Sequence, residues 1–553
     1  MTALIAIGLD AADPNVLETW MSAGKLPTLA RLRQKGCYSR LSNTEHYRAE
    51  TPWTTFISGQ PPEKTGYWGP IKYDPETYSV KEVGAYDYQE NPPFYALGEQ
   101  RKVIAFDIPQ SALSEQVNGT HVLGWGAHSP MTASHSTPEK ALAQIIAEHG
   151  EHPAFLKDFA ECRSLHALTR LQRAMSVGIE RKANICASLL SEQRWDLFLT
   201  IFGETHTAGH YMWHLSQPDH PLYCIAEAGA EDLMLKTFVE VDQAIGKILD
   251  ASPQPANVVI FSAHGMGANV MDVPSMVFLP ELMHRYSFAG KAAIAPGKVG
   301  NPLPPVETTF DQKRGWLGEI WNRRVPLNAI SRWLRSKMPV RVQKPLDIFL
   351  NKLLQPGLLC PSLLEQQGDS LFWQPAKWYE PLWPKMKAFA IPSYSEGYIR
   401  INVKGRESNG LVDAEDYETV CAELMDLLQK TTDGRTGQPL VDRVVQMRQD
   451  PFDSNPNLPD ADLVVLWSET IPSDVMDTTD YGRIGPVPHH RTGSHRAHGF
   501  VIADGPDIKG AKFKDNAQAV DLAPTLLGLL GIEDTHHLSG QNLFEHSSVT
   551  SVR

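Results

Sequence analysis

The chain has 553 residues, which is long enough for one large core with an insertion or for two domains. Charged residues make up 21% and hydrophobic residues 42%, as in an ordinary soluble globular protein. A net charge of −13 gives no support for sequence-independent binding to nucleic acid. No uninterrupted apolar run approaches the ~20 residues that a membrane-spanning helix requires, so we expect no membrane partner.

The distribution of the six cysteines favours a cytoplasmic protein. They lie far apart without a Cys-x-x-Cys pair, which is typical of reduced thiols rather than of a disulfide framework or a zinc ribbon. The N-terminus has no basic region ahead of its first apolar run, and that run ends in Asp10. It therefore predicts a strand rather than a signal peptide.

Asp10 occupies the first candidate position for chemistry. The sequence predicts a buried strand over Ala3–Leu9 and a helix that begins at Pro14, with Asp13 as its cap. Asp10 would then lie on the turn between the strand and the helix. Its carboxylate is either a metal ligand or a helix-capping group, and the local pattern favours neither role.

A candidate nucleophile follows in the segment 47–69. Pro52 suits the first turn of a helix, which would put Thr51 or Glu50 at the N-terminal end, where free backbone N–H groups attract an anion. Thr51 could then be a metal-activated nucleophile or simply the helix cap. Taken alone, the residue is better explained as a cap.

A short stretch in the middle of the chain combines a buried strand with histidines. Residues 197–202 are apolar and β-favouring, and the run ends at a glycine. If a helix opens at Thr205 or His206, then His206 and His210 lie on one face and can bind one metal ion, although the same spacing occurs on solvated helices. The position of the two histidines, just after a buried strand, favours metal binding over a solvated helix face, because ligands bind beyond the carboxyl ends of parallel strands.

The rest of the chain alternates predicted strands with helices and is interrupted once, which indicates an α/β protein. A strand over residues 257–262 ends beside His264, whose place between a buried strand and a glycine favours a ligand role. Six of the thirteen tryptophans lie in residues 280–390. We interpret that segment as an inserted cap between a first part of the core, 1–279, and a second part, 391–553.

Five motifs occur in order along the chain: Gly-Leu-Asp10, Thr51-Pro-Trp-Thr-Thr-Phe-Ile-Ser-Gly, His206-x-x-x-His210, Ser-Ala-His264-Gly and Gly-Ser-His495-Arg. Together they resemble the alkaline phosphatase superfamily, and most closely its branch of type I phosphodiesterases and nucleotide pyrophosphatases. The resemblance implies a central, mostly parallel sheet with helices on both faces and two metal ions at the strand ends. It also implies that His206, His210 and His495 bind the first ion, and that Asp10 and His264 bind the second.

The sequence departs from this family pattern at three positions. His206 and Ala263 stand where the family usually has Asp. The first site would thus be a three-histidine site, which favours zinc although manganese or iron would fit, and the second has lost a carboxylate. The usual nucleophile position aligns with Ala49; a local shift would put Thr51 there, and Glu50 could supply the missing carboxylate. One or two ions are expected, and without Thr51 a water bound to a single ion would attack.

We therefore expect a cytoplasmic, metal-dependent hydrolase or transferase that acts on a phosphoester, a phosphodiester or a related small anionic ester. Thr51 would attack, Glu204 could orient a histidine, and Arg496 could hold an anion. The alternatives are a different reaction on the same scaffold with a single metal ion, or a metal-stabilised binding protein that is not an enzyme. The sequence gives no indication of the oligomeric state.

Overall fold

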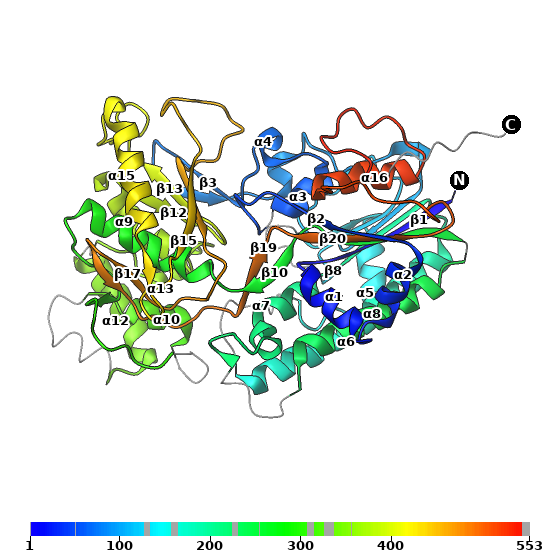
Figure 1. Ribbon diagram of the computed structural model, residues 1–553, viewed down its shortest axis with the longest axis horizontal. Helices are drawn as coiled ribbons and strands as arrows, with labels where there is room; N and C mark the ends of the chain where they lie inside the picture. The colour runs from blue at the N-terminus through cyan, green and yellow to red at the C-terminus, as the bar shows by residue number, and fades with distance from the viewer. Residues whose placement is uncertain are drawn as a thin grey trace.

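The computed structural model divides into two lobes that lie side by side (Figure 1). The structure describes residues 2–49, 51–126, 133–155, 164–223, 231–253, 255–306, 314–325, 337–354 and 357–544. The core lobe holds both ends of this described chain, and the second lobe is built mainly from residues 270–490. Within the described ranges, every helix is too short or too polar to cross a membrane.

The core lobe is built on an eight-stranded sheet whose centre is parallel. Strands β9, β1, β8, β5 and β6 run parallel, whereas β2, β20 and β7 pair antiparallel with their neighbours. The strands follow one another across the sheet in the order β2 (Cys37–Leu41), β20 (Gly499–Asp504), β9 (Ala256–Ser262), β1 (Ala3–Leu9), β8 (Leu197–Phe202), β5 (Val103–Phe106), β6 (Gly119–Leu123) and β7 (His135–Thr137). The predicted α/β class and mostly parallel central sheet are confirmed.

Helices cover both faces of this sheet, because residues of β1 alternate between two hydrophobic clusters. Ile5 and Ile7 belong to the cluster on one face, and Leu4 and Ala6 to the cluster on the other. The first face is covered by α1 (Pro14–Ser22), α2 (Pro27–Lys35), α5 (Ala141–His149), α6 (Leu165–Glu192), α7 (Glu204–Ser216) and α8 (Leu233–Asp250). The second face is covered by α3 (Thr51–Ser58) and α16 (Leu522–Leu529).

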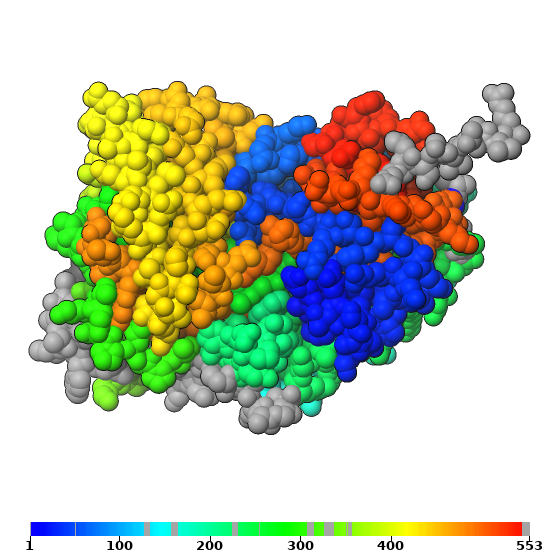
Figure 2. Space-filling model, viewed as in Figure 1, coloured from blue at the N-terminus to red at the C-terminus, as the bar shows by residue number. Residues whose placement is uncertain are grey.

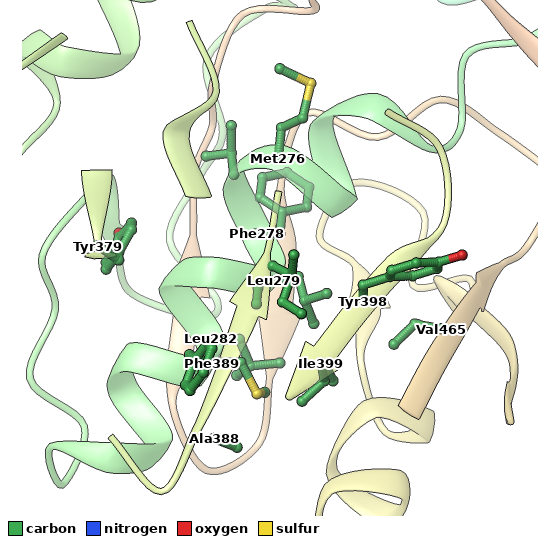
Figure 3. Packing of buried hydrophobic residues seen from close by; sticks show 14 of the residues in the cluster. Met276, Phe278, Leu279, Leu282, Tyr379, Ala388, Phe389, Tyr398, Ile399 and Val465 are labelled. Atoms are coloured by element: carbon green, nitrogen blue, oxygen red, sulfur yellow. The ribbon is translucent and has the colours of Figure 1, made fainter. Parts of the chain in front are cut away.

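The second lobe contains two antiparallel sheets and its own hydrophobic core. One sheet has the order β12 (Ala388–Ile391), β13 (Gly397–Ile401), β16 (Leu463–Trp467), β15 (Val441–Gln446), and the other has the order β11 (Pro296–Gly297), β18 (Gly482–Ile484), β17 (Met476–Thr478), β14 (Thr432–Asp433). The helices of this lobe are α9 (Leu279–Ser287), α10 (Gly315–Asn322), α12 (Val340–Leu354), α13 (Pro361–Gln367), α14 (Pro375–Trp378) and α15 (Tyr417–Gln429). Figure 3 shows part of the shared core, including Phe278, Leu279, Phe389 and Ile399.

The division between the lobes differs from the predicted cap boundaries. Trp316, Trp321, Trp378 and Trp383 are buried in the hydrophobic core of the second lobe. That core does not end at residue 390, since β13, β15 and β16 also belong to it, and the chain rejoins the large sheet only at β20. Alternating hydrophobicity predicts that a segment is a strand, but it does not specify which sheet the strand joins.

A two-stranded ribbon and a cluster of ion pairs join the lobes. The ribbon consists of β10 (Gly265–Ala268) and β19 (Gly493–Arg496) (Figure 1). Arg48, from the segment before α3, pairs through Nε with Glu396 of the second lobe at 3.0 Å and through Nη1 with Glu469. Glu469 also pairs with Nε of Arg496 at 3.3 Å. The space-filling view shows the two lobes in direct contact (Figure 2).

We expect Arg48→Met to lower the free energy of unfolding by about 3–5 kcal/mol, because the buried Glu396 carboxylate would lose its cationic partner. Arg443→Met is the matched control, since Arg443 pairs with Glu45 across the same lobes but both side chains are about half exposed. It should cost less than about 1 kcal/mol. Denaturant unfolding of both variants checks the difference, and equal losses would contradict a structural role for the buried pair.

Candidate metal centre

The first two candidate ligands lie on α7, at the carboxyl end of β8. All residues of β8 are buried, and the helix begins at Glu204, slightly earlier than expected from the sequence. His206 and His210 are one helical turn apart and both are buried. Their ring centroids are 4.3 Å apart, and the two Nε2 atoms are 3.0 Å apart. The predicted convergence of the two imidazoles is therefore present in the structure.

His495 completes a three-histidine cluster. It lies on β19 opposite Met266 of β10, and its ring centroid is 5.2 Å from that of His206 and 4.8 Å from that of His210. One ligand atom from each histidine lies within 4.8 Å of the others. All three side chains are buried, and they come from positions almost 300 residues apart in the chain.

The hydrogen bonds of His210 fix its tautomer. Nδ1 lies 2.7 Å from the backbone oxygen of Gly493, and because a carbonyl can only accept, Nδ1 must carry the hydrogen. The lone pair is then on Nε2, which points at His206. Burial, followed by the charge of Arg491, holds the pKa of His210 well below its usual value, so the ring is neutral. Neutral imidazoles with an oriented Nε2 are suitable ligands for zinc or a similar borderline metal.

A second pair of candidate ligands adjoins this cluster. Nε2 of His264 lies 3.6 Å from Oδ1 of Asp10, and the His264 ring centroid lies 4.8 Å from that of His495. Trp53 donates a hydrogen bond of 2.7 Å from Nε1 to the same oxygen of Asp10. Burial lowers the pKa of His264 to about 3, and within the described chain neither of its ring nitrogens makes a hydrogen bond. Buried imidazole nitrogens of this kind fit a metal-binding role.

The candidate nucleophile begins α3. Thr51 is completely buried, and its Oγ1 has no hydrogen-bond partner among the described residues. Trp53, on the same turn of helix, reaches Asp10, so the start of α3 lies beside the second pair of ligands. Ala49 is buried against the hydrophobic core of the second lobe. Glu50, proposed as a substitute carboxylate, lies outside the described residues.

Glu204 contacts a buried charge network that was not recognised from the sequence. Its Oε1 lies 3.0 Å from Nε2 of His152, while Lys182 is paired with Asp107 at 2.8 Å. Burial opposes ionisation of Glu204, but Lys182 and His152 outweigh it and lower the pKa of the carboxyl group. Its hydrogen bond is to His152 rather than to a histidine of the cluster. Lys182, a charged residue among the apolar positions of α6, was the one signal of this network in the sequence.

Arg496 mainly forms hydrogen bonds with backbone carbonyl oxygens of the ribbon. Its guanidinium donates to the carbonyl oxygens of Ala268 at 2.6 Å and His495 at 2.9 Å, in addition to its ion pair with Glu469. These bonds hold β10 and β19 together next to the histidine cluster. The role of anion binding therefore remains a prediction, and the observed contacts are those of a residue that positions His495.

A further charge cluster, which the sequence pattern does not indicate, lies near His210. Asp272 is buried, and its Oδ2 accepts hydrogen bonds from Arg491 Nε at 2.5 Å and Asn269 Nδ2 at 2.8 Å. Nδ1 of His490 lies 3.3 Å from the same oxygen. Although burial favours the protonated form, Arg491 and His490 lower the pKa of Asp272 to about 2. Since the folded-state pKa lies below the unfolded value, this carboxylate stabilises the fold above about pH 4 and loses that effect as the pH falls.

We expect Asp272→Asn to lower the free energy of unfolding by about 2 kcal/mol at neutral pH. The deficit relative to the wild type should shrink between about pH 4 and pH 2, where protonation removes the same interaction from the wild type. Denaturant unfolding at several pH values measures this difference. A deficit that stays constant as the solution is acidified would contradict the assignment of a depressed pKa to Asp272.

The chain resembles known proteins in both sequence and structure. A family model described as type I phosphodiesterase / nucleotide pyrophosphatase matches residues 4–301. No curated protein matches the chain. Among solved structures, phosphonoacetate hydrolase from Sinorhizobium meliloti 1021 in complex with phosphonoformate is 12% identical with a TM-score of 0.49, over 96% of this chain and 95% of that chain. Human ectonucleotide pyrophosphatase / phosphodiesterase 5 is 12% identical with a TM-score of 0.46, over 98% of this chain and 100% of that chain.

Proposed function

Because the chain belongs to the type I phosphodiesterase / nucleotide pyrophosphatase family, we propose that it is a metal-dependent hydrolase or transferase of phosphoesters or phosphodiesters. The observation that carries the proposal is the buried cluster of His206, His210 and His495, whose ligand atoms lie within 4.8 Å of one another. The three buried imidazoles bring their ring nitrogens together at one point, and nitrogen ligands in this arrangement are what zinc and similar cations bind. Convergence on one divalent cation accounts for all three.

The cluster would hold the first ion, for which zinc is the best candidate and manganese or iron are alternatives. Asp10 and His264 would hold the second. When bound, the ions would stabilise negative charge on the phosphoryl and nucleophile oxygens. The residues of the chain position the groups: Gly493 fixes the His210 tautomer, and Trp53 fixes the Asp10 carboxylate.

In this mechanism Thr51 is the nucleophile. Its Oγ1 gives up its proton to solvent and forms a bond to phosphorus, while the bond from phosphorus to the leaving oxygen breaks and that oxygen takes up a proton from solvent to become an alcohol. Water, in a hydrolase, or a second alcohol, in a transferase, then takes the phosphoryl group from Thr51. The N–H groups at the start of α3 favour an anion at that position. The substrate would be a small anionic ester, without nucleic acid or a membrane as partner.

We also propose a cytoplasmic location. The cysteines in the described part of the chain are free thiols, which suits a reducing compartment. They are Cys37, Cys186, Cys360 and Cys421.

A second candidate function is a different reaction at a single metal ion on the same scaffold. It is favoured by Ala263, which stands beside His264 where a carboxylate would complete the second site, and by Ala49, whose methyl group cannot act as a nucleophile. A non-catalytic, metal-stabilised binding protein is the remaining alternative. The number of bound ions separates these cases, because ester cleavage through Thr51 requires both sites.

We expect Thr51→Ala to abolish hydrolysis of an aryl phosphodiester while the metal content is unchanged, because only the attacking oxygen is removed. Thr55→Ala is the matched control, since Thr55 lies on the same helix, is also buried, and its hydroxyl likewise makes no hydrogen bond within the described chain. The control should retain activity. Hydrolysis that is equally fast in wild type and Thr51→Ala would exclude Thr51 as the nucleophile.

We expect elemental analysis of the purified protein to find two divalent ions per chain. His210→Ala should lose the first ion, and His264→Ala should lose the second while keeping the first, because the two sets of ligands are separate apart from their contact through His495. A wild type with a single ion, lost in His210→Ala, would instead support the mononuclear alternative. A protein without metal would favour the binding role.

A further inference from the structure

A cavity of about 530 Å³ lies beside the helix that carries Thr51. Its walls are formed by α3, by the segment around η1 (Ala85–Tyr88), and by the loop 110–116 that follows β5. A cavity of this size accommodates a small organic ligand.

The cavity lies near the candidate metal centre in the fold. Strands β5 and β8 are parallel neighbours in register, so the loop after β5 leaves the same edge of the sheet as α7, which carries two of the candidate ligands. Thr54 lines the cavity, and its hydroxyl donates a hydrogen bond of 3.0 Å to the backbone oxygen of Thr51. A substrate whose phosphoryl group lies at Thr51 could therefore extend along α3 into this cavity.

The lining has aromatic rings and uncharged polar groups. Tyr67, Tyr86 and Tyr88 contribute rings, and the centroids of Tyr67 and Tyr88 are 4.9 Å apart in an edge-to-face arrangement. Asn91 and Gln110 contribute side-chain amides. Ring faces and amides together provide apolar contact and both donors and acceptors, which is what a ligand with several hydroxyl groups requires.

The charge of the lining limits what the ligand can be. Among the described residues that line it, Glu115 is the one with a charged side chain, and it is exposed. An additional phosphate or carboxylate would find no guanidinium or ammonium group here to pair with. The chemistry of the wall therefore favours an uncharged, polar group over a second anion.

The loop that forms one wall is held rigidly. Asp107 and Gln110 have left-handed φ values of 62° and 53°. The Asp107 carboxylate accepts hydrogen bonds of 2.9 Å from the backbone N–H groups of Trp125 and Gly126 and pairs with Lys182. Strained backbone that is fixed by buried contacts keeps a binding surface in one conformation before the ligand arrives.

We propose that this cavity binds an uncharged, hydroxyl-rich part of the substrate, a sugar or another polyol, which is esterified to the phosphoryl group that reacts at Thr51. The assignment to the substrate rests on the proposed function. The polyol is the alcohol retained on phosphorus after the first step, and its hydroxyl groups are recognised by the amides and hydroxyls of the wall.

The test uses three synthetic diesters with the same 4-nitrophenyl leaving group and the same single negative charge, in which the retained alcohol is glucose (through O6), ethanol or thymidine (through O5′). With the zinc-loaded full-length chain, we expect kcat/KM to be about tenfold higher for the glucose ester than for the ethyl ester. Ala112→Phe, which adds a ring inside the cavity, should abolish this preference. Leu411→Phe, at an exposed position in the second lobe, is the control and should leave it unchanged.

Binding without turnover separates the cavity from the proposed reaction. Calorimetry should show that glucose 6-phosphate binds about tenfold more tightly than ethyl phosphate, and that Ala112→Phe equalises them. If no diester is hydrolysed, the proposed function fails while this affinity ratio still tests the cavity. Equal affinities in the wild type, or a stronger preference for the thymidine ester, would overturn the polyol assignment.

Discussion

The parallel register of β8, β1 and β9 is the constraint on which the candidate site depends. Leu9 lies opposite Phe202 on β8, and Gly8 lies opposite Phe261 on β9, so the three strands end almost level at one edge of the sheet. Asp10, the start of α7 and His264 therefore leave the sheet together. The histidine cluster and its neighbouring pair of ligands are a consequence of strand pairing rather than of any one motif.

The close packing of α3 against β1 brings the candidate nucleophile, Thr51, to the same edge of the sheet. A Cβ at position 8 would lie 3.2 Å from the Trp53 ring and 2.3 Å from Cδ1 of Ile201, so glycine at this position leaves room for both side chains. Trp53 in turn donates to Asp10, which links α3 with the second pair of ligands. The first turn of the helix, with Thr51, is positioned by these contacts.

The three buried histidines also depend on both lobes being in place. His495 lies on the ribbon that links the lobes, and Arg496 joins the two strands of that ribbon by donating to the carbonyl oxygen of Ala268. Because Arg48 and Arg496 share Glu469 of the second lobe, the ion pairs between the lobes adjoin the segments that carry Thr51 and His495. The second lobe therefore contacts the segments that position the candidate site.

The sequence by itself determined the parallel α/β core, the strand ends at Asp10 and His264, and the spacing of His206 and His210, because hydrophobic periodicity and helical geometry are local properties. Only the tertiary structure decided which partners the polar side chains bind. In the folded chain Glu204 pairs with His152, and Arg496 donates to backbone carbonyl oxygens. Strands β12 to β16 belong to the sheets of a separate lobe. Such pairings join residues far apart in the chain, and they follow from packing that no local pattern encodes.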